Sequence, residues 1–252
     1  MTTNKETFNG ANFYDWAFGE GISPEEKFII EAYLDKNLKT LEAGTGGGRI
    51  VFGMQDLGFK SLYGFDYLPK FIELARQRNK TGSISFSVQD ASTLTYQNEE
   101  FDQLVYLQQI VCCIEDENAR LSAFKNAYRI LKQGGTALFS FLYFESRIQS
   151  SFHSAYLTYI QGLRKLFNSE FSIQYNSLLK LGGKPNLGAI FDRQPYTYWY
   201  RLEEVYQILK DVNFKIVAVG SDLQLRRGEM LTSLEAMKNE PIEGMLYFVC
   251  KK

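Results

Sequence analysis

The residues best suited to ligand chemistry lie in the segment 42–51, which reads Glu-Ala-Gly-Thr-Gly-Gly-Gly-Arg-Ile-Val. A glycine-rich turn between an expected strand and an expected helix lets the backbone approach a bound ligand and directs helical N–H groups at it. The dinucleotide-binding spacing G-x-G-x-x-G does not fit, because its third glycine falls on Arg49 or Val51. The pattern present is an acidic residue followed by a glycine at every second position: Glu42, Gly44, Gly46 and Gly48.

Two further acidic residues follow the glycine turn at equal intervals. Asp66 stands 24 residues after Glu42, and Asp90 stands 24 residues after Asp66, which is the length of one strand–helix unit. In open α/β sheets, ligands bind beyond the carboxyl ends of the strands, at the topological switch point. Since a carboxylate accepts hydrogen bonds through two oxygens, Asp66 is suited to binding a pair of hydroxyl groups. The alternative, in which Asp66 or Asp90 only caps a turn, stays open on these residues alone.

Taken together, these residues resemble the first motifs of class I S-adenosylmethionine-dependent methyltransferases of the small-molecule type. Later family landmarks follow in order, at 101–105 (Phe-Asp-x-x-Val) and at 129–135 (Arg-Ile-Leu-Lys-x-Gly-Gly). The resemblance covers about residues 38–143 well and 197–252 loosely.

The resemblance implies S-adenosylmethionine as the cofactor and implies a role for each strand end. Asp66 resembles the acidic residue that meets the ribose hydroxyls, Asp90 the one that meets the adenine amino group, and Gln108 a residue lining the methionine end. Tyr14 resembles an arm tyrosine that covers the methionine end in related enzymes, although ordinary packing is an open alternative. The predicted cofactor-binding residues are Glu42, Gly44, Thr45, Gly46, Asp66, Tyr67, Asp90, Ala91, Gln108 and Tyr14.

The elements that must position these residues alternate between strands and helices. This rhythm predicts an α/β fold with a Rossmann-like, doubly wound and mostly parallel sheet that carries helices on both faces. The resemblance adds that the last strand runs antiparallel, beside the one before it. A serine cap, a proline and a glutamate at 23–26 predict a helix start with a capping box. Strands are expected at 39–43, 61–67, 84–88, 103–107, 136–143, 214–219 and 245–250, and further helices at 49–57, 69–78, 118–131 and 202–209.

Residues 144–200 interrupt the alternation between the fifth and sixth strands. These 57 residues are too many for a plain loop, and 12 of them are aromatic. Apolar residues recur there at helical spacing, so we expect an inserted helical cap that binds the methyl acceptor, with a turn at 181–186. The expected organisation is therefore an N-terminal arm at 1–22, a cofactor-binding core at 23–143 and 201–252, and the cap.

Composition limits the classes of partner. The 28 basic and 29 acidic side chains nearly cancel, which argues against binding along a nucleic-acid backbone. Cys112, Cys113 and Cys250 have no metal-ligand spacing and are expected to be reduced thiols, so no metal site is predicted. No apolar run reaches the roughly 18 residues of a membrane helix, and the first residues do not resemble a signal peptide. We expect a cytoplasmic monomer or homodimer with no nucleic-acid or membrane partner.

Methyl transfer from a sulfonium is a direct displacement, so a protein mainly aligns the reacting atoms and excludes water. A general base is needed only for an acceptor that holds its proton tightly. His153 is the one histidine of the chain and lies in the expected cap, which makes it the candidate base, with solvent exposure as the alternative. Further candidates for the acceptor pocket are Glu145, Tyr156, Asp192, Tyr198 and Tyr200.

The acceptor class follows from what the sequence contains and lacks. No Asp/Asn-Pro-Pro-Tyr/Phe sequence follows the fourth expected strand, and no Pro-Cys nucleophile is present, as base-methylating enzymes require. An aromatic-rich cap suits a small, partly aromatic or amine-bearing metabolite, methylated on O or N. Two alternatives stay open: aminopropyl transfer on the same fold, for which Glu115 and Asp116 give thin support, and a protein that binds S-adenosylmethionine without catalysis.

Overall fold

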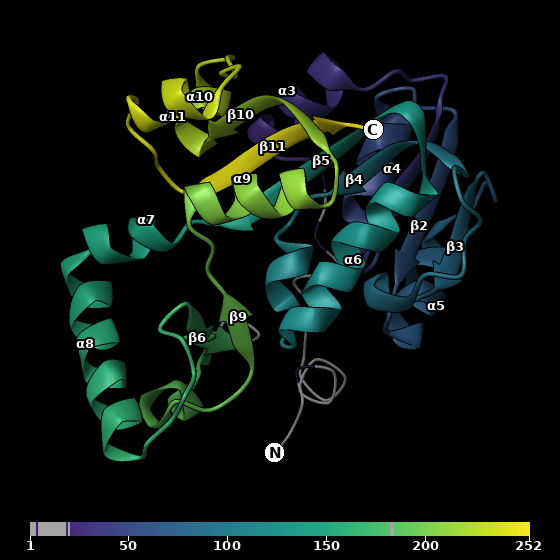
Figure 1. Ribbon diagram of the computed structural model, residues 1–252. Helices are drawn as coiled ribbons and strands as arrows, with labels where there is room; N and C mark the ends of the chain where they lie inside the picture. The colour runs from purple at the N-terminus through teal and green to yellow at the C-terminus, as the bar shows by residue number, and fades with distance from the viewer. Residues whose placement is uncertain (1–3, 5–18, 20, 182–183) are drawn as a thin grey trace.

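A single seven-stranded sheet organises the chain in the computed structural model, which describes residues 4, 19, 21–181 and 184–252 (Figure 1). The strand order is β10-β11-β5-β4-β1-β2-β3. Pairs among β1 to β5 are parallel, whereas β11 lies antiparallel between β5 and β10. The predicted mostly parallel sheet with an antiparallel last strand is confirmed. The strands are β1 Lys39–Ala43, β2 Ser61–Asp66, β3 Ile84–Val88, β4 Phe101–Tyr106, β5 Leu131–Leu142, β10 Lys215–Ser221 and β11 Met245–Lys251.

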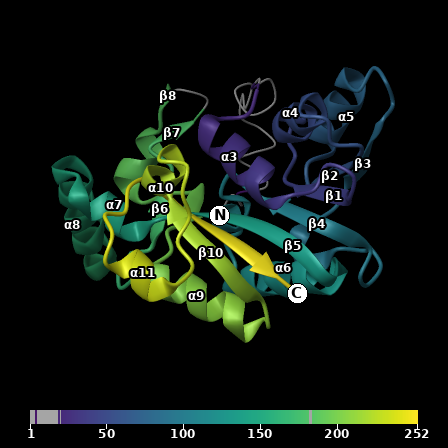
Figure 2. The ribbon, with the colours of Figure 1, turned by 90° about the horizontal axis from the view of Figure 1, so that it is seen from above.

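Helices cover both faces of this sheet, as predicted (Figure 2). On one face, α3, α4 and α5 pack through Ile30, Val51 and Ile72. On the other, α6 and α9 pack through residues such as Phe124 and Leu209. Both apolar layers are closed to solvent, so the polar ends of the strands are what the fold leaves accessible. The helices are α3 Pro24–Tyr33, α4 Arg49–Asp56, α5 Pro69–Arg78, α6 Glu117–Ile130, α9 Leu202–Asp211, α10 Asp222–Arg226 and α11 Leu234–Lys238.

Local sequence accounts for the start of α3. The Ser23 hydroxyl accepts a hydrogen bond from the Glu26 backbone N–H at 3.2 Å, and the Glu26 carboxylate accepts one from the Ser23 N–H at 2.8 Å. These two bonds form the predicted capping box and satisfy N–H groups that have no partner within the helix. The Glu26 side chain is buried, although a residue that only caps a helix can stay exposed to solvent.

The helix α6 ends at Ile130, one residue before its expected end, and the glycine pair that follows it lies in a strand. Both Gly134 and Gly135 are part of β5. A Cβ atom on Gly135 would approach the Asp102 backbone oxygen at 2.8 Å. Gly135 therefore permits close backbone approach at the start of β5 rather than a helix stop.

Residues 144–200 form helices first and strands afterwards. The first part consists of α7 Phe144–Gln149 and α8 Ser151–Leu166, in agreement with the helical spacing of its apolar residues, while its role as a cap that binds the acceptor stays a prediction. The second part is not α-helical, in contrast to the expected cap, because strands of two or three residues are too short to show a period in sequence. It consists of β6 Tyr175–Ser177, β7 Lys180–Leu181, β8 Lys184–Pro185, the 3₁₀ helix η3 Leu187–Phe191 and β9 Tyr196–Tyr198.

Both ends of this insertion are attached to the sheet near the carboxyl end of β5. Tyr143 forms an isolated bridge with Tyr200, and the Tyr200 N–H donates to the Leu142 oxygen at 2.8 Å. The strand β9 packs against η2, a 3₁₀ helix at Ile110–Cys113 that follows β4. The insertion thus leaves and rejoins the core beside the strand ends. Across the described ranges, no helix has the length and apolar character needed to cross a membrane.

Candidate active site

Two adjoining cavities open at the carboxyl ends of β1 to β4, with volumes of about 340 Å³ and 250 Å³. The first is lined by the glycine turn, the end of β2 and the residues after β4. The second is lined by the residues after β3, with Asp90 and Ala91, and by the start of α6. Four residues line both cavities, so the two form one continuous elongated site: Gly44, Tyr67, Ile110 and Cys113.

The glycine turn owes its shape to backbone conformations that favour glycine. Gly44, Gly46 and Gly48 have φ angles of 60°, 53° and 92°, in the left-handed region. A Cβ on Gly44 would lie 2.2 Å from Cδ1 of Ile110, a residue that lines both cavities. The missing side chain therefore leaves open the space in which a ligand can lie against the backbone.

Glu42 holds the glycine turn in place through hydrogen bonds. Its carboxylate accepts hydrogen bonds from the Thr45 hydroxyl at 2.5 Å and from the Val51 N–H at 3.1 Å, and its side chain is buried. Burial raises the pKa of Glu42 to about 8, partly opposed by these bonds and by the Arg49 charge. Glu42 and Thr45 both line the first cavity, so bracing and ligand contact are compatible roles.

Asp66 lies at the end of β2, where its buried side chain lines the first cavity. Its two carboxylate oxygens accept hydrogen bonds from the Gly46 N–H at 3.0 Å and the Leu68 N–H at 2.9 Å. Burial raises its pKa to about 6, against these backbone bonds. The Asp66 carboxylate thus joins the glycine turn to the β2 end, and each oxygen retains a lone pair for a ligand hydroxyl.

Asp90 has the capping role that the sequence left open, and it also lies at the site. Its carboxylate accepts from the Ser92 N–H at 2.9 Å and the Ser92 hydroxyl at 2.7 Å, which caps η1, a 3₁₀ helix at Ala91–Thr93. The side chain is exposed and lines the second cavity. Capping therefore fixes the orientation of this carboxylate at the second cavity.

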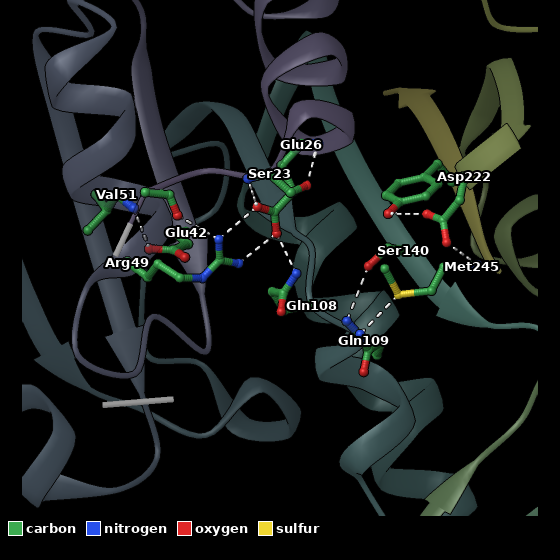
Figure 3. A network of polar contacts seen from close by, with 12 residues as sticks. Ser23, Glu26, Glu42, Arg49, Val51, Gln108, Gln109, Ser140, Asp222 and Met245 are labelled. Carbon is green, nitrogen blue, oxygen red and sulfur yellow. Dashed lines mark hydrogen bonds and ion pairs between the residues drawn. The ribbon is translucent and has the colours of Figure 1, made fainter. Parts of the chain in front are cut away.

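A polar network that the sequence did not predict includes residues that line the first cavity (Figure 3). Arg49 donates to both oxygens of the Glu26 carboxylate, at 2.8 Å and 2.6 Å, and Gln108 donates to the same carboxylate. Both Arg49 and Gln108 line the cavity. The capping box at 23–26 predicted only a helix start, and no local pattern connects Glu26 to Gln108, which lies 82 residues further along the chain.

The residues after β4 have an uncommon backbone conformation. Gln108 and Gln109 have φ angles of 59° and 57°, in the left-handed region that residues with side chains rarely adopt. The Gln109 N–H donates to the Ser140 hydroxyl at 3.1 Å, and its side-chain amide lies 2.9 Å from the Met245 sulfur. Contacts to β5 and β11 thus hold a strained turn in the cavity wall, as is common at functional sites.

The structure does not bring His153 to these cavities. His153 lies on α8, is absent from the lining of both cavities, and packs its ring against Phe152. Both ribbon views place α8 at the opposite end of the molecule from α4 and α5 (Figures 1 and 2). Burial, and then the nearby Arg147 charge, lower the pKa of His153. A catalytic role for His153 stays a prediction, and Tyr14 lies outside the described residues.

The other candidates in the insertion mostly have partners within the protein. Glu145 pairs with Arg201, and Asp192 pairs with Arg164. Tyr156 donates to the Ala189 oxygen, and Tyr198 donates to Glu204. In contrast, the hydroxyl of Tyr200 is buried without a hydrogen-bond partner. Over the part of the chain that the structure describes, no cluster of three His, Cys, Asp or Glu residues is arranged to hold a metal ion.

Comparison with known proteins identifies this arrangement. Residues 41–139 match the family model described as a methyltransferase domain. The chain is 27% identical over 146 residues to phosphoethanolamine N-methyltransferase of Plasmodium falciparum, a match spanning 55% of this chain and 54% of that protein. It is 26% identical over 129 residues to the ribosomal protein L11 methyltransferase of Dictyoglomus thermophilum, covering 49% and 40% of the two chains. The chain thus spans about half the length or less of these two relatives.

The fold has close counterparts among solved structures. A crystal structure of an S-adenosylmethionine-dependent methyltransferase from Methanosarcina mazei superposes with a TM-score of 0.66 at 19% identity, over 92% of this chain and 98% of that one. Residues 41–139 thus match a methyltransferase domain, the fold is that of a solved S-adenosylmethionine-dependent methyltransferase, and the two findings together imply S-adenosylmethionine as the cofactor. The continuous site at the strand ends fits S-adenosylmethionine, since it offers an open glycine turn and the carboxylate of Asp66.

We predict that Gly44→Ala impairs cofactor binding. The substitution places a methyl group against Ile110 and strains the left-handed backbone, so we expect the dissociation constant for S-adenosylmethionine to rise at least tenfold in calorimetric titration. Gly82→Ala is the matched control, because Gly82 has a φ angle of 68° but open space around its Cβ position. Equal losses of affinity in the two variants would contradict the assignment.

We predict that Glu42 makes the protein less stable as pH rises. Its raised pKa means that the folded state binds a proton that the unfolded state releases, so this stabilisation is lost as pH rises through about 8. Between pH 6.5 and 8 the free energy of unfolding should fall by about 2 kcal/mol in the wild type and by less in Glu42→Gln. Asp66 titrates below this window. Parallel denaturant titrations check the difference, and identical slopes in both proteins would disprove it.

We predict that Asp66→Ala weakens S-adenosylmethionine binding at least tenfold, because losing two hydrogen bonds at a buried carboxylate exceeds about 1.4 kcal/mol. Asp211→Ala, an exposed aspartate at the end of α9, is the control and should bind as the wild type does. Circular dichroism melting shows whether each variant is folded. An unchanged dissociation constant for a folded Asp66→Ala protein would refute the cofactor assignment.

Proposed function

We propose that this chain transfers the methyl group of S-adenosylmethionine to an O or N atom of a small, partly aromatic or amine-bearing metabolite. The observation that carries the proposal is the convergence of the glycine turn, Asp66 and Gln108 on one continuous site at the strand ends. In the family these positions hold the cofactor, and the insertion at 144–200 begins and ends beside them. The acceptor would then bind between the first cavity and the insertion.

Bound S-adenosylmethionine would supply an activated methyl group, which the acceptor lone pair takes in a direct displacement while the carbon–sulfur bond breaks. The residues of this chain provide alignment and exclude water. Asp66 would bind the ribose hydroxyls, and Asp90 would bind at the adenine end. Glu26 would keep Arg49 and Gln108 fixed around the methionine end, since both donate to its carboxylate. A proton released by the acceptor would pass to solvent or to a base in the insertion.

Several buried polar atoms of the insertion have no hydrogen-bond partner, which supports an acceptor site there. Arg147 is partly buried, its guanidinium stacks 4.1 Å from the Trp199 ring centroid, and its Nε is buried without a partner. Burial lowers the pKa of Arg147 to about 10. Buried polar groups are normally hydrogen-bonded, so unpaired ones indicate a ligand or water that the protein is built to receive. Other such atoms are Glu145 Oε2, Asn176 Oδ1, Gln194 Oε1 and the Tyr200 hydroxyl.

The names of the two sequence relatives point to different acceptors. The Plasmodium protein is named for methylating phosphoethanolamine, a small amine, and the Dictyoglomus protein for methylating a ribosomal protein. The aromatic side chains of the insertion favour a small acceptor, because tyrosine and tryptophan rings bind cationic amines and apolar rings. The test must therefore include acceptors of both kinds.

The decisive experiment incubates the protein with S-adenosylmethionine carrying a labelled methyl group and separate pools of small amines, phenols and carboxylic acids, with ribosomal protein as a further pool. We expect label in a small molecule, and no transfer with Asp66→Ala. Label in the ribosomal protein alone would overturn the acceptor class. Tight binding of the cofactor with no transfer to any pool would favour a non-catalytic binding protein, and transfer from decarboxylated S-adenosylmethionine would favour aminopropyl transfer.

A further inference from the structure

Exposed large apolar side chains gather on the insertion. Among the described residues, nine of the twelve exposed large hydrophobic side chains lie between residues 148 and 191. Large exposed apolar side chains that gather in one region are uncommon on a monomeric protein and mark an interaction site. The nine residues are Ile148, Phe152, Tyr159, Leu166, Phe167, Phe171, Leu187, Ile190 and Phe191.

Three of these residues form a regular stripe on α8. Phe152, Tyr159 and Leu166 recur every seven residues, and 68%, 45% and 73% of their surfaces are exposed. Ala155 and Gly162 lie between them, also exposed, and a Cβ on Gly162 would meet nothing within 4 Å. A seven-residue repeat of large residues with small residues between them is the pattern of a helix surface that packs against another helix.

The 3₁₀ helix η3 lies beside this stripe and adds further exposed apolar side chains. The Tyr159 hydroxyl donates to the Ile190 oxygen at 2.9 Å, so η3 lies directly beside the middle of α8. Leu187 and Phe191 on η3 are 70% and 65% exposed. We refer to the stripe of Phe152, Tyr159 and Leu166, together with Leu187, Ile190 and Phe191, as the α8 face.

We propose that the α8 face binds the α8 face of a second copy of this chain, with the two α8 helices antiparallel about a two-fold axis. Antiparallel pairing can place Tyr159 against Gly162 of the partner subunit and Leu166 against Ala155 of the partner subunit. Two of the three large side chains then meet small ones, whereas parallel pairing in register would set large against large. A two-fold contact uses the same surface on both copies, which closes the assembly at a dimer.

The charges on α8 favour a second copy of this chain as the binding partner. The segment 146–169 contains no acidic residue, and its charged residues are Arg147, Arg164 and Lys165. Arg164 is buried and paired with Asp192, so Lys165 is the exposed charge within α8 itself. Antiparallel pairing sets the two copies of Lys165 at opposite ends of the contact and avoids repulsion. A membrane-binding helix instead carries many Lys and Arg residues on its polar face.

The available area also suits a dimer. A whole aromatic side chain presents about 200 Å², so the exposed parts of the six residues of the α8 face come to several hundred Å² on each copy. A standard protein interface buries roughly 800 Å² on each partner, with aromatic residues enriched at its centre. Polar residues around the α8 face would supply the rest. The dimer would hold the insertion of each subunit in a fixed arrangement.

The test measures the mass of the full chain by sedimentation equilibrium, over protein concentrations of roughly 10 to 100 µM. We expect the wild type to be a dimer and Gly162→Glu to raise the dimer dissociation constant at least tenfold. Gly162 is well suited to this substitution, because its surroundings are open and glutamate favours a helix more than glycine does. Gln161→Glu is the matched control: it adds the same charge at the next exposed position, off the stripe.

Other outcomes would overturn the proposal. These are a monomeric wild type at every concentration, or a dimer that Gly162→Glu and Leu166→Glu leave intact. Sedimentation with vesicles of phosphatidylcholine and phosphatidylserine identifies a lipid occupant: a monomer that binds vesicles through the α8 face also contradicts it. Unchanged S-adenosylmethionine binding and thermal melting in Gly162→Glu show that the variant is folded, so loss of the dimer cannot be attributed to unfolding.

Discussion

The shape of the first cavity depends on one buried carboxylate, that of Glu26. Its side chain is only 1% exposed, and a charge so placed is tolerable only if it is paired and hydrogen-bonded. The partners come from three different places in the chain: the start of α3, Arg49 at the start of α4, and Gln108 after β4. Because all of them satisfy one group, the glycine turn and the end of β4 are held at a fixed separation.

The second constraint is the absence of side chains from the glycines of the turn. Gly44 leaves the cavity open, while Glu42 and Asp66 hold the turn through hydrogen bonds to its hydroxyl and backbone groups. Both carboxyl groups are buried, and both have raised pKa values for that reason. The site therefore combines a flexible residue type with rigid supports, so the backbone can approach the cofactor without losing its shape.

The insertion has two surfaces that differ in polarity. Its inner side attaches to the core through Tyr143, Tyr200 and β9, beside the cavity, and includes buried polar atoms without partners. The α8 face is a second surface of the same insertion, made of exposed apolar side chains that line neither cavity. Substitutions on the α8 face therefore leave the residues that line the two cavities unchanged.

The sequence by itself determined the sheet, its helices and the residues at the strand ends. The strands 39–43 and 84–88 and the helix 69–78 have the bounds expected from local patterns, since side-chain periodicity and helix caps act over a few residues. The glycine spacing and the equal intervals to Asp66 and Asp90 placed those residues at the cavities. Only the tertiary structure decided that Glu26 meets Gln108 and that His153 lies apart from both cavities. Such contacts join residues far apart in the chain, and their geometry follows from how whole elements pack, which no local pattern encodes.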